Sequence, residues 1–182
     1  MRALGGSGVK GVFWKEGEPF TNSMSLIVSL LIRYPEIATL SLNPDEGSFA
    51  FSFIFKRAFS PVEIKELREN LTDSLYALLE LNNQQTTVLK ISFHKLKGFS
   101  FLELKRDIVS FSQEEITLVT EIIGSRYAQE IIRDQEEGIA EDEQLFQEEM
   151  IDHMLEDLKD TRQERRLIGI REEGRVMIFN HS

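Results

Sequence analysis

The sequence predicts an α+β fold, built on a four-stranded antiparallel sheet with helices packed against it. Three observations predict it. The 182 residues have the apolar (41%) and charged (29%) content of a globular protein. Apolar residues alternate with a period of two in four segments and follow a helical period in others. A strand followed by a capped helix also occurs twice, which indicates an internal repeat.

The repeated helix start has the pattern of a capping box. In such a start the serine accepts a hydrogen bond from the first turn, and the glutamate three positions later bonds back to the serine N–H. A Phe-Ser-Phe strand precedes each copy and leads into a Lys-Arg pair. The two copies are Phe59-Ser60-Pro61-Val62-Glu63-Ile64 and Phe111-Ser112-Gln113-Glu114-Glu115-Ile116.

Residues 1–21 hold five of the eleven glycines, which predicts a flexible N-terminal arm. A helix over residues 23–34 follows and is stopped by Pro35. Its polar residues fall on one narrow stripe, so most of its circumference is apolar. Such a helix is normally covered on most sides, and we expect it to lie at the centre of the core.

The rest of the body is two hairpins, each followed by a capped helix. The hairpins span residues 37–55 and 87–108, and the helices begin at Pro61 and Gln113. Gly124 lies inside the second helix and costs roughly 1 kcal/mol relative to alanine, which is tolerable if another element packs closely there.

Without the first helix, the order of elements is ββαββα. Moving the last strand of a ferredoxin-like βαββαβ unit to the front produces this order. The sequence therefore predicts two αββ repeats in a permuted ferredoxin-like arrangement, with two helices on one face of the sheet. The first helix, over 23–34, is expected on the other face or at an edge.

The last third of the chain differs in charge. Residues 112–182 carry nineteen acidic and eight basic side chains, whereas 22–111 are neutral. An acidic run over 134–149 reads as a solvated linker or helix junction, a helix is expected over 141–162, and a hairpin over 167–179. The predicted division is an arm (1–21), an α+β body (22–137) and a C-terminal helix-plus-hairpin appendage (138–182).

Several classes of site are disfavoured. The absence of cysteine excludes disulfides and thiolate chemistry. Glu149, His153 and Asp157 fall four apart on one helix, but the Glu-x-x-His pairs of di-iron bundles are missing, so we expect no metal. The longest apolar run, 24–32, is too short to span a membrane. No catalytic or cofactor-binding motif occurs, so the sequence indicates no catalytic residues and no cofactor.

One strand resembles the RNP1 stretch of the RNA recognition motif. The resemblance implies that Phe99 and Phe101 stack on bases while Lys97 meets a phosphate. Ser100, Leu102 and Leu104 depart from the family pattern. The stretch reads Lys97-Gly98-Phe99-Ser100-Phe101-Leu102-Glu103-Leu104.

A second interpretation makes Phe99 and Phe101 part of the core, covered by the first helix or by the C-terminal helix. The chain has two surplus amphipathic helices, and the bare aromatic face of a sheet is a natural surface for them. The acidic net charge of −10 also disfavours nucleic acid.

The C-terminal helix and the basic residues behind it form a candidate partner-binding surface, unless they complete the core. Methionine suits adaptable contacts, and neighbouring charge of both signs suits a charged partner or self-association. The candidate residues are Phe146, Met150, Met154, Leu158, Arg165 and Arg166.

The sequence therefore predicts a non-enzymatic cytoplasmic protein that binds another protein or itself. The alternative is an RNA- or ribosome-associated protein that uses the sheet face at residues 97–104. The third interpretation is an enzyme, for which a pocket with a shifted carboxyl pKa near His94 would be the structural sign.

Overall fold

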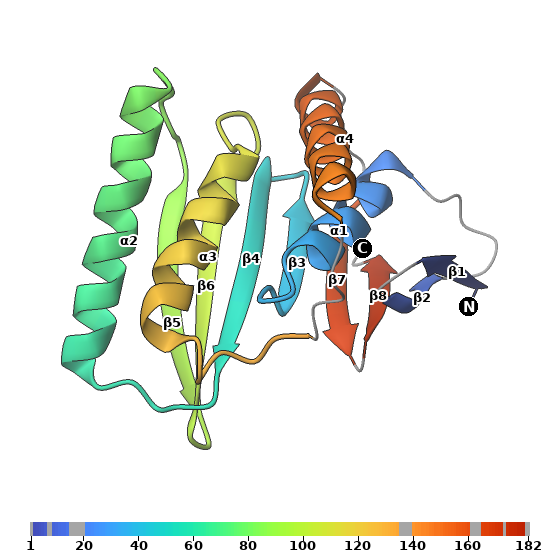
Figure 1. Ribbon diagram of the computed structural model, residues 1–182. Coiled ribbons are helices and arrows are strands. Elements are labelled where there is room, and N and C mark those ends of the chain that lie inside the picture. Colours follow the sequence, from blue (N-terminus) through green and yellow to red (C-terminus); the bar gives the residue numbers. More distant parts are fainter. Residues whose placement is uncertain are drawn as a thin grey trace.

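The computed structural model describes residues 2–6, 9–14, 21–134, 140–160, 165–172 and 174–180, the first two ranges by their backbone alone. Within these ranges the chain forms four helices and eight strands (Figure 1). The helices are α1 (Asn22–Arg33), α2 (Pro61–Leu81), α3 (Gln113–Tyr127) and α4 (Glu141–Asp160). The strands are β1 (Arg2–Gly6), β2 (Val9–Trp14), β3 (Thr39–Asn43), β4 (Ser48–Phe55), β5 (Leu89–Leu96), β6 (Phe99–Asp107), β7 (Leu167–Glu172) and β8 (Arg175–Asn180).

The sheet is larger than the four strands that the sequence predicts. Its order is β1-β2-β8-β7-β3-β4-β6-β5, and the six strands from β8 to β5 are antiparallel throughout. The predicted four strands lie side by side as β3-β4-β6-β5. In a sheet of only four strands, the outer edge of β3 would be unpaired. An isolated hairpin is marginal in water, and β7-β8 is stabilised by pairing with that edge.

The two ends of the chain join this sheet. Residues 2–6 and 9–14, expected as part of a flexible arm, form β1 and β2, and β2 pairs with β8 in parallel. Leu40 of β3 pairs with Gly169 of β7. The C-terminal hairpin therefore lies in the same sheet as the body. The permuted ferredoxin-like arrangement of β3 to β6 stays a prediction.

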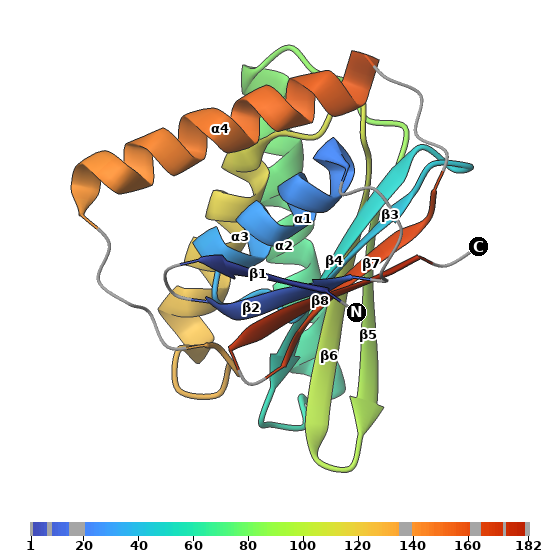
Figure 2. The same ribbon diagram turned by 90° about the vertical axis from the view of Figure 1, so that its right-hand side faces the viewer.

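All four helices lie on one side of the sheet (Figures 1 and 2). The expectation that α1 would cover the other face or an edge is wrong. It packs on β3, β7 and β8, on the same face as α2 and α3. The fit is close at Gly169, where a β-carbon would lie 2.2 Å from Cγ2 of Ile27, so β7 needs a glycine under α1.

Helix α4 forms an outer layer across α1 (Figure 2). Ile151, Leu155 and Leu158 are buried in the core, and Arg33 donates to Glu148 across the helix pair at 2.6 Å. This explains the nearly all-apolar circumference of α1, because the sheet covers one side of that helix and α4 covers another.

Phenylalanine rings join the two repeats in the core. Four alternate phenylalanines of β4 (Phe49, Phe51, Phe53 and Phe55) are buried under the helices. Phe111, which precedes the second cap, stacks on Phe49 with ring centroids 5.2 Å apart. Phe59, which precedes the first cap, lies 5.0 Å from Phe55. Both predicted capping boxes are present.

Gly124 lies in α3 as expected, and the condition of close packing by another element is not met among the described residues. A β-carbon at this position would meet no neighbouring atom within 4 Å. Close packing by another element therefore does not require a glycine here.

Candidate functional site on the open sheet face

The face of the sheet opposite the helices, called the open face below, has no described helix over it (Figure 2). Side chains alternate along each strand. On β6, Leu102 and Leu104 are buried toward the helices, as predicted, while Phe99, Phe101 and Glu103 point the other way.

At one end of the open face, five apolar or aromatic side chains form what we call the aromatic corner. Cross-strand pairing aligns Ile54 with Phe101 and Phe101 with His94, and Leu96 pairs with Phe99. Phe99 is 40% exposed and Leu96 58%, and Phe101 is half-buried. The interpretation that Phe99 is covered by a surplus helix is therefore wrong, because both surplus helices pack on the opposite face.

Exposed lysines flank the aromatic corner. Lys56 directly follows β4 and Lys97 lies in the turn between β5 and β6, whereas Lys90 pairs with Lys105 farther along β5. Lys105 lies on the same face and hydrogen-bonds Glu46, and this bond and the lysine charge lower the pKa of Glu46. The helices, in contrast, carry seventeen acidic and five basic side chains. Negative charge is therefore concentrated in the helical layer, and the aromatic corner is locally basic.

Farther across the open face, on the other side of β3 and β4, β7 and β8 contribute what we call the aliphatic patch. Its members are Ile168, Ile170, Met177 and Phe179, and Phe179 is 39% exposed. Small polar side chains of β3 and β4 lie between the patch and the aromatic corner, and Thr39 and Ser52 hydrogen-bond there at 2.5 Å. The open face thus has two apolar patches.

The candidate surface on the C-terminal helix is divided by the fold. Phe146 and Met150 are exposed, at 64% and 46%. Met154 is partly buried against the core, and Leu158 is buried in it. Leu158 therefore has no surface to offer a partner.

The two arginines after α4 lie near the β3-β4 turn. Arg166 donates to Asn43 at 3.2 Å and pairs with Asp45 at 3.6 Å. Arg165 also has interaction partners. At least Arg166 is thus used in joining β7 to the body.

An acidic groove lies between α3 and α4. The cavity has a volume of about 420 Å³, and its lining includes Glu114, Glu121, Glu148 and Asp152. Burial and the neighbouring carboxylates raise the pKa of Asp152. The Gln113 amide bridges the Asp152 carboxylate and the Tyr34 hydroxyl at 3.0 Å each. Because this bridge also joins α1, α3 and α4, the arrangement is explained by the packing of the helices.

The structural sign expected for an enzyme is not present in the described cavities. His94 lies at the aromatic corner and lines neither the acidic groove nor the cavity at the end of α2. No group of three or more histidine, cysteine, aspartate or glutamate side chains in the described part of the chain is placed to hold a metal ion.

No protein family model, curated protein or solved structure matches the chain. None of the helices in the described ranges is long and apolar enough to cross a membrane. The geometry of the open face therefore carries the functional argument.

Sequence reasoning identified Phe99, Phe101 and Lys97 but missed their neighbours. The sequence signal that could have located these neighbours was the Lys97-Gly98 pair. It forms a tight turn in which both residues have positive φ. A two-residue turn pairs Leu96 with Phe99, and this register places His94 beside Phe101. The aliphatic patch gave no comparable signal, because the position of β7-β8 in the sheet depends on long-range pairing.

Proposed function

We propose that the protein is a non-enzymatic cytoplasmic protein that acts by binding another protein, with the open face as its binding surface. The observation that carries this proposal is the one-sided cover of the sheet. Exposed apolar patches, such as the two on this face, are typical of interaction sites. The permuted ferredoxin-like arrangement belongs to the same proposal and is supported by the strand order β3-β4-β6-β5.

A second copy of this chain is the simplest partner. Each open face offers two apolar patches, so two faces can bury them against each other. In such a dimer the acidic helical layers lie on the outside, where their mutual repulsion is weakest. The formal charge of −10 therefore does not oppose this mode of association.

The test is light scattering on the full chain over a hundredfold range of concentration. We expect an assembly that is lost in the double variant Phe99→Ser, Phe179→Ser. Phe146→Ser is the matched control, since it removes an equally large exposed ring from α4. If the wild type is monomeric, a second copy is not the partner. If only the control loses assembly, the binding surface lies on α4 and not on the open face.

Single-stranded RNA is the second candidate ligand, favoured by the exposure of Phe99 next to the exposed lysines Lys56 and Lys97. Base stacking on an aromatic side chain contributes about 1–3 kcal/mol per base, so Phe101→Ala should weaken binding about tenfold. Fluorescence anisotropy with labelled single-stranded RNA at low salt measures this, with Phe179→Ala as the control. Absence of binding by the wild type would end this candidate.

A further inference from the structure

The free edge of the sheet at β5 has the features of a peptide-binding site. In the described part of the chain, β5 pairs only with β6, so one row of its backbone groups is unpaired. Such an edge can accept an added strand from another chain. This surface is distinct from the open face, so the inference does not rest on the proposal above.

The register shows which backbone groups point outward. The two-residue turn makes Leu96 and Phe99 a hydrogen-bonded pair, and Asp107 N–H donates to the Val88 carbonyl at 3.2 Å. Even-numbered residues of β5 therefore bond to β6. The N–H and C=O groups directed to the free edge are those of Leu89, Ile91, Phe93 and Lys95.

Helix α2 lies alongside this edge and makes it a groove. The Arg68 guanidinium lies over the Phe93 ring, 5.4 Å from its centroid. Farther along α2, the exposed Tyr76 and the buried Leu79 line one cavity. We call the surface formed by Arg68, Tyr76, Leu79 and the outward side of β5 the edge groove.

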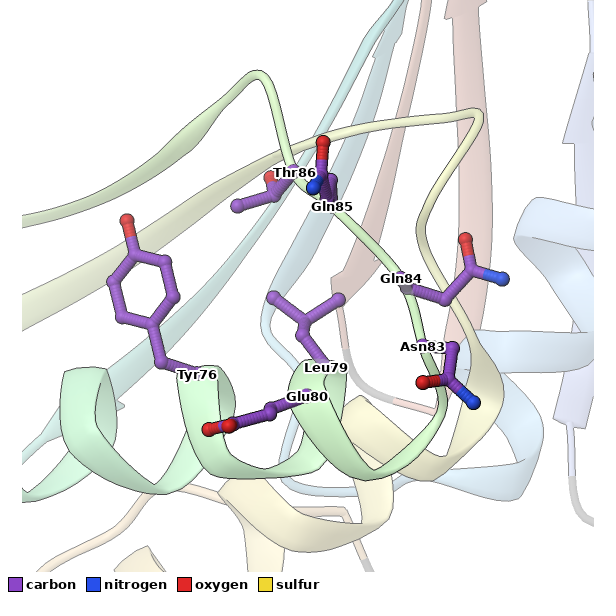
Figure 3. A pocket seen from close by; sticks show the side chains of 7 residues that line it. All are labelled: Tyr76, Leu79, Glu80, Asn83, Gln84, Gln85 and Thr86. Atoms are coloured by element: carbon purple, nitrogen blue, oxygen red, sulfur yellow. The ribbon is translucent and has the colours of Figure 1, made fainter.

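A cavity of about 590 Å³ lies at the end of the edge groove where β5 begins (Figure 3). Tyr76, Leu79 and Glu80 rise from α2 on one side of it. The loop that leads to β5 closes the other side with amide and hydroxyl groups, from Asn83, Gln84, Gln85 and Thr86. This end of the groove can hold one apolar side chain and hydrogen-bond the backbone beside it.

Positive charge at the other end of the edge groove indicates which kind of ligand it binds. Arg68 and Lys95 are both exposed, and neither makes an ion pair within the described residues. A second copy paired edge to edge would bring the lysines of both β5 strands together, and edge lysines are a common protection against such pairing. An acidic strand would instead neutralise them.

We propose that the edge groove binds an extended acidic segment of another protein, which adds a strand to β5. Its backbone bonds the outward groups of Ile91 and Phe93. Its carboxylates pair with Arg68 and Lys95, and an apolar side chain enters the cavity beside Tyr76.

The test is amide hydrogen exchange of the full chain with a defined probe, a ten-residue peptide in which threonine alternates with aspartate, except that valine replaces the aspartate at the end that enters the cavity. The outward N–H groups of Ile91 and Phe93 should exchange at least tenfold more slowly with the peptide. Those of Ser92 and His94 already bond to β6, so they act as internal controls and should not change. The matched peptide with lysine in place of aspartate should give no protection.

Charge-reversal variants test the acidic preference. The double variant Arg68→Glu, Lys95→Glu should weaken the aspartate peptide at least tenfold. Lys90→Glu makes the same charge change as Lys95→Glu alone, on the open-face side of β5, and should weaken it less than threefold. The proposal would be overturned if exchange at Ile91 and Phe93 were unchanged in millimolar peptide. It would also be overturned if odd and even positions were protected equally. The edge lysines would then serve only to prevent strand pairing. Phe99→Ser should leave peptide binding intact, which separates this site from the open face.

Discussion

In the first copy of the repeated unit Arg57 bonds Glu63 near the surface, whereas in the second copy Arg106 bonds Glu115 where neither side chain reaches solvent. The same Arg–Glu pair, next to the same capping box, therefore has two environments. Arg57 retains 39% exposure of its side chain and also lies over the Phe59 ring, 5.6 Å from its centroid. Arg106 has 0% exposure.

The difference arises between the strand and the cap. Arg57 lies three positions before Ser60, and Arg106 six before Ser112. The longer connection in the second copy forms a turn in which Ser110 donates from its hydroxyl to Asp107 at 2.6 Å and from its N–H at 3.0 Å. A short insertion thus surrounds the arginine with polar partners and allows it to be buried.

The buried guanidinium of Arg106 is fully used. Its Nε and Nη2 donate to the two oxygens of Glu115 at 2.6 and 3.0 Å. Its Nη1 donates to Thr86 at 2.5 Å, to the Val88 carbonyl at 2.9 Å and to Asp107. The network joins the loop after α2 to β6 and α3, so it links three elements that are separate in sequence.

The largest expected effect comes from removing the cation of each copy. Arg106→Met leaves the buried carboxylates of Asp107 and Glu115 without their cation, and breaking such a pair costs about 3–5 kcal/mol. Arg57→Met removes an exposed pair and should cost about 1 kcal/mol or less. Urea unfolding followed by circular dichroism measures both free energies of unfolding. Equal costs would show that the burial of Arg106 has no energetic consequence.

If Arg106→Met does not fold, the paired change Arg106→Met, Glu115→Leu is the recovery variant. Replacing Arg106 and Glu115 with apolar groups removes the unpaired carboxylate of Glu115 but leaves Asp107 without its cation, so we expect part of the lost stability to return. A double variant no more stable than the single one would contradict the assignment of the cost to Glu115.

The next effect is a dependence on pH that should be larger in the second copy than in the first. Burial disfavours the charged form of Asp107, but hydrogen bonds from Ser110 and Thr86 and the Arg106 charge outweigh it and hold its pKa well below the usual range. Its stabilisation is therefore fully present above the unfolded pKa of about 3.9 and lost as pH falls toward the folded pKa. The first copy has Ala58 after its arginine and no equivalent carboxylate.

Asp107→Asn should therefore flatten the acid limb of the stability curve. We expect the loss of unfolding free energy between about pH 4 and pH 2 to shrink by about 1–2 kcal/mol. Glu63→Gln is the comparison in the first copy. Hydrogen bonds from Ser60 and the Arg57 charge lower the pKa of Glu63 as well, so this variant should also flatten the acid limb, but less than Asp107→Asn because the pair lies nearer the surface. If the acid limb of Asp107→Asn keeps its slope, another carboxylate is responsible for it.

The two copies of a strand followed by a capped helix were predictable from the sequence, because the residue patterns that mark them are local. A serine with a glutamate three residues later starts a helix, and Gly98 permits the positive φ of a tight hairpin turn. The burial of Arg106 was not predictable from the same pattern, since Arg57 has it as well. The decisive partners, Thr86 and Val88, come from a loop whose approach depends on the packing of α2.

The candidate surfaces follow the same division. Alternation correctly placed Leu102 and Leu104 in the core, so the outward direction of Phe99 and Phe101 was predictable. Their exposure was not, because it depends on where α1 and α4 pack. The apolar circumference of α1 indicated a covered helix, but α4 provides part of the cover on the same side of the sheet, and Gly169 fixes the position of α1 over β7.

The smallest expected effect is the difference in stability that alanine substitution gains in α3 and in α2. Counting from the two capping serines, Gly124 of α3 matches Thr72 of α2. A β-carbon at Gly124 meets no atom within 4 Å, so Gly124→Ala keeps the packing and gains the helix propensity of alanine, about 1 kcal/mol. Thr72→Ala should gain about 0.7 kcal/mol or less. Thermal unfolding should show a higher Tm for both variants, with the larger rise for Gly124→Ala. A lower Tm for Gly124→Ala would show that α3 needs the glycine for a close approach, such as that of a bound partner or a second copy.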